Sequence, residues 1–471
     1  MTTLRFHGSA AVLLLPLALF VAVTARLFIS EAAFDLTGLA AAGVLTLFSG
    51  SLLAKSPSEY WKAAVRGASS ELTGTVVLIL IASGIFSAMM KASGVADGLV
   101  FLGGMLHLTG HAFTVFVLLA SSLMAAATGS SIGTLLAAMP IFFPAGVALG
   151  ADPAMLAGAV LSGAIFGDNL APVSDVTVIS SVTQRFRDGT PADIAGVVRT
   201  RLPYAMTALA VSMPVYAFMG ASRPVSEAAL SGDASALLML VPVAVLIAVA
   251  VRTRDVLMAI SAGAVTGTAT GLLIGRLSFA TIFAADDGRL SGFLISGISN
   301  VSPIILLCVT LFAFTGIVRE AGVPDMMAKA LEAGSAGRPS ALRTELFLSA
   351  ATLVVTLFAA VTSASVALVG SLTDDIGRAS NVHPYRRSHI LSGLANSLPV
   401  LMPFSAFVLI TMAAVSGLEG AAAVTPFTLM TAAFYPIALF LVFGFMVLTG
   451  TGRMMETPEP EAAEAKTATA L

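Results

Sequence analysis

The 471-residue chain has little of the charge that a water-soluble protein carries on its surface. Only 11% of its residues are charged, 57% are apolar, and the mean hydropathy is +0.96. Soluble domains contain about 25% charged residues, so this chain has too little polar surface to coat a water-exposed globule. The scarcity of charge therefore predicts an integral membrane protein.

Other absences exclude further classes of protein. The single cysteine, Cys308, cannot form an intrachain disulfide. A net charge of −2 leaves no basic surface of the kind that binds nucleic acid. No glycine–lysine pair occurs, which excludes the P-loop through which many proteins bind ATP. We therefore expect no cofactor and no nucleic-acid partner.

Long apolar runs are what the chain has in abundance. A membrane-spanning helix needs about 20 mostly apolar residues, and such runs recur along the chain, several of them short or interrupted by Gly and Pro. They predict an all-α polytopic membrane protein with about 10–13 transmembrane segments, some of them broken helices or re-entrant hairpins. We expect one transmembrane domain over residues 1–452 and a disordered cytoplasmic tail over 453–471, where apolar periodicity ends.

The basic residues between the apolar runs indicate the orientation. Lys and Arg concentrate in loops on the cytoplasmic side of a membrane. Three linkers are basic, whereas the intervening loops at 26–35 and 221–235 are poor in basic residues. The linkers contain Lys55, Lys62 and Arg66; Arg185, Arg187, Arg199 and Arg201; and Arg252 and Arg254. This pattern predicts a cytoplasmic N-terminus, with the first apolar run kept as a helix.

Three sequence features occur in the same order in both halves of the chain. A hydroxyl-rich stretch, TGSS at 128–131 and TSAS at 362–365, is followed about thirty residues later by Leu-Ser-Gly, at 161–163 and 391–393. Each Leu-Ser-Gly leads into a break that contains proline. Duplicated broken segments with small residues point to the site of a transporter built from inverted repeats. The expected bounds of the two repeats are about 73–220 and 292–450.

The densest group of polar residues inside apolar sequence is GDNLAPVSDVT at 167–177. Charges at membrane depth are costly and usually mark an ion path, and proline disrupts the helix and frees backbone carbonyls. Carboxylate, amide and hydroxyl oxygens suit a hard cation, and a desolvated carboxylate can also take a proton. We predict a proton- and Na⁺-binding site at Asp168 and Asp175, supported by Asn169, Ser174 and Thr177. The alternative is a loop in which Asp168 or Ser174 caps the next helix.

The hydroxyl-rich stretches are predicted to supply the rest of a substrate site. A broken helix offers carbonyls and helix-end dipoles to an ion or substrate, although tight helix packing is the alternative for any single residue. The first-half candidates are Thr128, Gly129, Ser130 and Ser131. The second-half candidates, which carry no acid, are Thr362, Ser363, Ser365, Asn396, Ser397 and Ser405.

The sequence GSSIG at 129–133 also fits G-x-S-x-G, the nucleophile elbow of soluble hydrolases. That motif needs a strand–turn–helix and a positioned histidine, and the surrounding sequence implies neither. An intramembrane serine hydrolase with Ser131 as nucleophile is therefore the remote alternative, and we expect the protein not to be an enzyme.

Two further groups of residues are expected to have structural roles. The first lies in a basic and acidic stretch that we expect to face water, and comprises Asp374, Asp375, His383, Arg386, Arg387 and His389. The second is a ladder of glycines spaced four residues apart: Gly263, Gly267, Gly271 and Gly275. Such a ladder lets two membrane helices approach closely. Whether the partner helix belongs to this chain or to a second subunit is open at this point.

The stretch SGAIFGDNLAPVSDVTVIS at 162–180 resembles the signature of the NhaC-type sodium/proton antiporters, which reads G-D-[KN]-[LM]-[SA]-P-[LIV]-S-D-T-T. Val176 stands where that pattern has its first Thr. The TGSSIGT stretch at 128–134 is also similar to the family. In the second half, many members have Pro-Trp-Asn-Thr where this chain has PFSA at 403–406, which removes an amide and a hydroxyl.

The resemblance implies a secondary transporter in the lipid bilayer of a bacterial inner membrane. It implies inverted repeats and Na⁺ and protons as transported ions, and it allows a homodimer. Together with the paired carboxylates it predicts sodium/proton antiport by competition of the two ions for buried carboxylates. The altered second-half motif leaves open the alternative of a sodium- or proton-coupled carrier of a small organic acid or amino acid.

Overall fold

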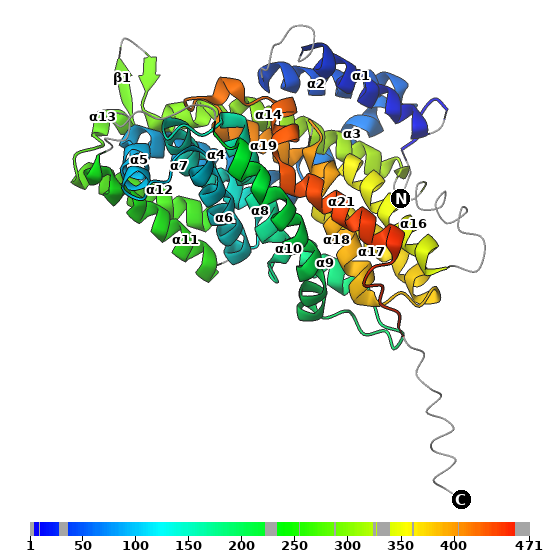
Figure 1. Cartoon of the computed structure of the whole chain (residues 1–471). Coiled ribbons are helices and arrows are strands. Elements are labelled where there is room, and N and C mark those ends of the chain that lie inside the picture. Colours follow the sequence, from blue (N-terminus) through cyan, green and yellow to red (C-terminus); the bar gives the residue numbers. More distant parts are fainter. Residues whose placement is uncertain are drawn as a thin grey trace, which may run out of the picture.

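The computed structural model is almost entirely helical in the part of the chain that it describes (Figure 1). That part comprises residues 4–8, 10–27, 36–221, 233–253, 255–286, 289–323, 326, 340–359, 362–403 and 405–456. Most of the predicted tail, residues 457–471, lies outside it. The first four tail residues, 453–456, pack on the helices, since the Glu456 amide donates to the Asn381 carbonyl at 2.7 Å.

The elements follow the apolar runs of the sequence. Within the first half they are η1 (Ala10–Leu13), α1 (Leu14–Ala25), α2 (Leu36–Leu53), α3 (Pro57–Ala68), α4 (Glu71–Ser93), α5 (Val95–Met105), α6 (Gly110–Thr128), α7 (Ser131–Ala148), α8 (Pro153–Leu170), α9 (Asp175–Val182) and α10 (Ile194–Met219). The second half contains η4 (Ala234–Leu240), α11 (Val241–Thr253), α12 (Val256–Leu273), α13 (Phe279–Ile282), β1 (Ala284–Asp286), β2 (Arg289–Ser291), α14 (Phe293–Glu320), α16 (Ala341–Ala359), α17 (Thr362–Ala379), α18 (Pro384–Ala395), η5 (Leu398–Leu401), α19 (Ala406–Val415), η6 (Ala421–Ala423), α20 (Pro426–Ala432) and α21 (Phe434–Thr449).

Eight helices of the described residues are long and apolar enough to cross a membrane, or up to ten if each of two bent pairs counts as one span. The bent pairs are α18–η5 with α19, at 52°, and α20 with α21, at 53°. The predicted all-α membrane fold with broken helices is thereby confirmed, and the described residues supply fewer spans than the predicted 10–13 unless both bent pairs are counted. The relation of the two halves by inverted repeats stays a prediction.

The glycine ladder packs against helices of the same chain. A Cβ added at Gly263 would lie 3.1 Å from the Phe86 ring on α4 and 3.2 Å from Leu246 on α11, and one at Gly267 would lie 2.3 Å from Met89. Gly263 and Gly267 therefore make the predicted close approach to α4 and α11, whereas Gly271 faces Leu277 and a Cβ at Gly275 would have nothing within 4 Å. This answers the question left open by the sequence, because the partner helices belong to this chain.

Helix α8 lies inside the molecule, packed against α6, α7, α10 and α21. Its small residues make this possible: a Cβ at Gly163 would meet the Leu118 carbonyl of α6 at 2.4 Å, and one at Gly167 would meet the Ser122 carbonyl closer still. Helix α18 is its second-half counterpart in burial, packed against α9, α10, α16 and α17. The candidate residues described below lie at the C-terminal ends of α8 and α18.

Candidate functional site

Asp168 lies in the last turn of α8 and is 6% exposed. The Ser131 hydroxyl, on the first residue of α7, donates to Asp168 Oδ2 at 2.6 Å. Ser130 caps α7 by accepting from the Gly133 amide at 3.1 Å. The partial positive charge of a helix N-terminus favours a nearby anion, so α7 begins beside the carboxylate that its dipole stabilises. The structure thus brings the two predicted first-half clusters together at Asp168.

Gly129 allows the two clusters to meet. It ends α6 with φ +70°, a left-handed conformation that favours glycine. A Cβ at this position would also lie 2.6 Å from the Val173 side chain and 3.2 Å from the Ser174 amide. The chain that follows the proline break of α8 therefore passes directly over Gly129. Beside it, Thr128 is bonded to the Met124 carbonyl at 2.9 Å.

The supporting oxygens predicted around Asp168 have different surroundings. Asn169 donates through Nδ2 to the Tyr435 hydroxyl at 3.1 Å, while its Oδ1 is buried without a partner among the described residues. Ser174 is 1% exposed and lies beside Asp168, but its Oγ makes no hydrogen bond of normal geometry in the described part of the chain. The Ser174 oxygen beside the carboxylate and the Asn169 oxygen one residue along the chain are therefore both left unpaired in the described part of the chain. Buried polar atoms without partners are uncommon in proteins and call for an explanation, such as an ion that is bound in another state.

The two remaining predicted first-half residues lie on α9. Asp175 is the first residue of the helix and is exposed, in contrast to Asp168. Thr177 is fully buried, and its Oγ1 accepts from Arg201 Nη2 at 2.7 Å. Thr177 therefore contacts a cationic side chain rather than the carboxylate.

The second-half candidates are buried but make mostly local contacts. Ser365 donates to the Thr362 carbonyl at 2.8 Å, Ser397 to the Leu394 carbonyl at 2.6 Å, and Ser405 to the Val400 carbonyl at 2.5 Å. Thr362 and Ser405 line a cavity of about 50 Å³. No contact described in this part of the structure joins these hydroxyls to Asp168.

Asn396 differs from the other second-half candidates. It follows the last residue of α18, is fully buried, and has neither amide atom paired among the described residues. It stands in N-x-x-P at 396–399, as Asn169 does in N-x-x-P at 169–172. The two broken helices thus end on a buried asparagine with an unpartnered oxygen. Ser363, by comparison, is half-buried.

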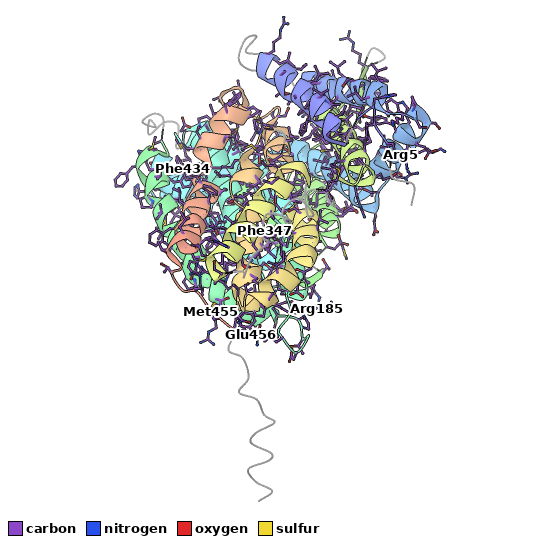
Figure 2. All side chains as sticks on the ribbon, turned by 90° about the vertical axis from the view of Figure 1, so that its right-hand side faces the viewer. Arg5, Arg185, Phe347, Phe434, Met455 and Glu456 are labelled. Carbon is purple, nitrogen blue, oxygen red and sulfur yellow. The ribbon has the colours of Figure 1, made fainter. Side chains whose placement is uncertain are left out.

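The stretch expected to face water is instead largely buried. Arg386 donates to Glu345 Oε1 at 2.9 Å, and both side chains are fully buried. Arg387 donates to Asp374 Oδ1 at 2.8 Å and to the Arg185 carbonyl at 2.6 Å. These pairs lie near the end of the molecule where Figure 2 labels Arg185, Met455 and Glu456. The expectation of a solvated face is wrong for Asp374, Arg386, Arg387 and His389. Carboxylates and carbonyls from distant segments surround the two arginines, and the His389 ring packs against Tyr204 and Phe443.

Sequence reasoning also missed three buried polar residues. Arg201, placed in a basic linker, is instead inside α10 and fully buried. Tyr435 of α21 contacts Asn169 at the site, and Glu345 of α16 pairs with Arg386. Only Arg201 carried a signal in the sequence. The apolar run 202–219 follows it directly, so it could have been assigned to the start of that membrane helix rather than to a loop.

The surroundings of Ser131 differ from those of a hydrolase nucleophile. Helix α6, not a strand, precedes it, and its hydroxyl bonds to Asp168 rather than to a histidine. Among the described residues, no three His, Cys, Asp or Glu side chains lie together as a group that could hold a metal ion. The site is one buried carboxylate beside the hydroxyls of Ser131 and Ser174, a chemistry suited to a proton or a weakly held hard cation.

Comparison with known proteins is informative at this point. Residues 3–221 match a family model described as the Na⁺/H⁺ antiporter family. The Malate-2H⁺/Na⁺-lactate antiporter of Bacillus subtilis is 31% identical over 176 residues, 37% of this chain and 36% of that protein. The Na⁺/H⁺ antiporter NhaC of Alkalihalophilus pseudofirmus is 28% identical over 280 residues, 54% of this chain and 58% of that protein. The chain thus matches less than two thirds of the length of either relative.

Two solved transporter structures are similar over longer stretches at low identity. The YdaH transporter of Alcanivorax borkumensis shares 13% identity with a TM-score of 0.38, covering 83% of this chain and 88% of its own. The MtrF efflux pump of Neisseria gonorrhoeae shares 12% identity with a TM-score of 0.39, covering 92% of this chain and 95% of its own.

Proposed function

We propose, because residues 3–221 match the Na⁺/H⁺ antiporter family model, that the protein exchanges Na⁺ for protons across a bacterial inner membrane. The observation that carries this proposal is the state of Asp168. It is a buried carboxylate whose hydrogen-bond partner is a serine hydroxyl, not an arginine or lysine. A carboxylate at membrane depth that no fixed cation contacts directly can still bind a mobile one.

Exchange follows if the two ions occupy Asp168 in turn. The ionised carboxylate, with the oxygens of Ser131, Ser174 and Asn169 around it, offers the hard ligands that Na⁺ prefers. The protonated carboxylate would retain the hydrogen bond from Ser131 but would have lost the charge that attracts Na⁺. Each ion therefore displaces the other, and neither passes without the exchange.

Asp175 and the asparagines have secondary roles in this proposal. Asp175, exposed at the start of α9, is the carboxylate from which a cation would reach Asp168. Asn396 and the second-half hydroxyls would line the other side of the path. The proposal includes a cytoplasmic N-terminus, as the basic linkers predict, and a protein that acts as a transporter and not as an enzyme.

A second candidate function is a coupled carrier of a small organic acid. The observation that favours it is the 31% identity to a malate/lactate antiporter. The carrier would use the same carboxylate for its coupling ion. Proton flux without any organic solute separates the two functions, because only an ion exchanger supports it.

The test is proton flux in proteoliposomes under an imposed pH gradient, with Na⁺, Li⁺ and K⁺ added in turn. We expect Na⁺ to dissipate the gradient, Asp168→Asn to abolish this response, and Asp175→Asn to reduce or abolish it. Asp97→Asn, which changes an exposed carboxylate on α5, is the control and should transport normally. Wild-type rates in both Asp168→Asn and Asp175→Asn would refute the site. A folded protein with no cation response, but with flux when malate or lactate is added, would replace ion exchange by the organic-acid carrier.

A further inference from the structure

The buried arginine of α10 has no role in the function proposed so far. Arg201 lies seven residues after α10 begins at Ile194, about 10 Å along the helix axis. Its side chain is fully buried. Nη1 donates to Ser392 Oγ at 2.5 Å and Nη2 to Thr177 Oγ1 at 2.7 Å, while Nε has no partner among the described residues.

These partners fix the guanidinium in place but do not neutralise it. Both are neutral hydroxyls, one from α9 in the first half and one from α18 in the second half. Arginine stays charged in proteins, and an isolated buried charge costs several kcal/mol. A charge kept at this depth therefore needs a compensating anion within electrostatic range.

Asp168 is the carboxylate that meets this need. The other two buried carboxylates of the described residues, Glu345 and Asp374, form ion pairs with Arg386 and Arg387. Asp168 forms no such pair. It lies at the end of α8, just before the break that leads into α9, the helix whose Thr177 accepts a hydrogen bond from Arg201. Asp168 is therefore the buried carboxylate left to compensate Arg201, without a direct salt bridge among the described contacts.

We propose that Arg201 is an internal counter-charge that balances Asp168 when no ion is bound and thereby sets the affinity of the site for Na⁺. This inference rests on the proposed exchange at Asp168. With the site empty, the ionised carboxylate and the guanidinium sum to zero. With Na⁺ bound they sum to +1, and the guanidinium repels the bound cation. Arg201 thus weakens Na⁺ binding and favours its release, which a carrier needs on each side of the membrane.

The proposal predicts an unusual effect, a gain of affinity from a damaging mutation. Arg201→Gln should lower the KM for Na⁺ at least about tenfold, because two unit charges a few Å beyond contact interact by a few kcal/mol at the effective dielectric of a protein. Turnover should fall as well, because the bound ion is released more slowly. KM is measured by ²²Na⁺ uptake at alkaline pH, where protons compete least. A purely structural role predicts the opposite change, a weaker site with a higher KM.

Two matched variants complete the test. Arg199→Gln removes an exposed arginine two residues away on the same helix and should leave KM and turnover unchanged. Arg201→Lys keeps the charge and should hold KM within about threefold of wild type. An unchanged or higher KM in folded Arg201→Gln would overturn the proposal. If Arg201→Gln does not fold, Arg201→Lys decides alone, and a tenfold higher KM there overturns it. Failure of the exchange function itself is recognised separately, by wild-type protein without Na⁺-driven proton flux.

Discussion

The two halves of the molecule treat their buried carboxylates in opposite ways. Glu345 of α16 is held by two arginines, Arg386 at 2.9 Å and Arg453 at 2.9 Å. Asp168 of α8 is held by the hydroxyl of Ser131. A carboxylate saturated by fixed cations can only hold the structure together, whereas one contacted by a neutral donor can still bind a mobile ion. Burial alone therefore does not identify the functional acid, but the charge of its neighbours does.

The largest effect that tests this comparison is the loss of Glu345. In Glu345→Gln the fully buried guanidinium of Arg386 loses its counter-ion. Removing one partner of a buried ion pair costs about 3–5 kcal/mol, so we expect a large drop in the thermal unfolding temperature in detergent. Asp168→Asn should cost less, because it breaks no direct ion pair and leaves Arg201 its hydrogen bonds to Thr177 and Ser392.

A double variant shows whether the lower unfolding temperature of Glu345→Gln has an electrostatic cause. Replacing both partners of a buried pair by apolar residues of similar size is often neutral or stabilising. Glu345→Met with Arg386→Met should therefore recover much of the unfolding temperature, since the partly exposed Arg453 can turn to water. If Glu345→Gln melts like wild type while Asp168→Asn unfolds, the roles assigned to the two carboxylates are reversed.

The sequence was sufficient to predict the class of protein and the broken segment that carries Asp168. Both rest on local properties: apolar runs long enough to span a membrane, and two acids next to a proline. It also indicated that TGSS would belong to the same site, and the structure places Ser131 against Asp168. The repeated order of the motifs in the two halves was enough to connect TGSS with the Asp168 segment, although the sequence contains no information on contacts.

The basic residues were predicted poorly, and for a physical reason. Whether Arg386 faces water depends on Glu345, which lies 41 residues earlier and has no motif of its own. Arg201 was counted with a loop because it stands beside Arg199, just before the apolar run that begins at residue 202. Charge patterns reveal the side of a membrane on which a segment lies, but the partner that permits a buried charge is a tertiary contact.

A smaller effect should separate the hydroxyl-rich stretches of the two halves. Ser131 and Ser365 hold equivalent places in TGSS and TSAS, yet Ser131 bonds to the Asp168 carboxylate and Ser365 to the Thr362 carbonyl. A hydrogen bond to a charged group contributes about 1.5–3 kcal/mol, so we expect Ser131→Ala to raise the KM for Na⁺ about tenfold. Ser365→Ala should leave the KM unchanged. Equal effects of the two variants in ²²Na⁺ uptake would mean that both halves bind the ion.

The smallest effect concerns Ser174, whose buried Oγ has no partner among the described residues. Replacing an unpaired buried hydroxyl removes a desolvated group and no hydrogen bond, so Ser174→Ala should leave the free energy of unfolding within about 0.5 kcal/mol of wild type. If this oxygen is a ligand of the transported cation, the KM for Na⁺ should nevertheless rise about threefold, by about 0.7 kcal/mol. The two measurements are made on the same preparation, by thermal unfolding and by ²²Na⁺ uptake.

Ser180 provides the opposite case on the same helix. Its hydroxyl donates to the Thr177 carbonyl at 3.0 Å and accepts from Ser388 Oγ at 3.0 Å, so both of its bonds hold the structure. Ser180→Ala should cost about 1 kcal/mol of unfolding free energy and leave the KM unchanged. A reversed result, with Ser174→Ala destabilised and its KM unaltered, would show that the unpaired oxygens beside Asp168 serve the fold and not the ion.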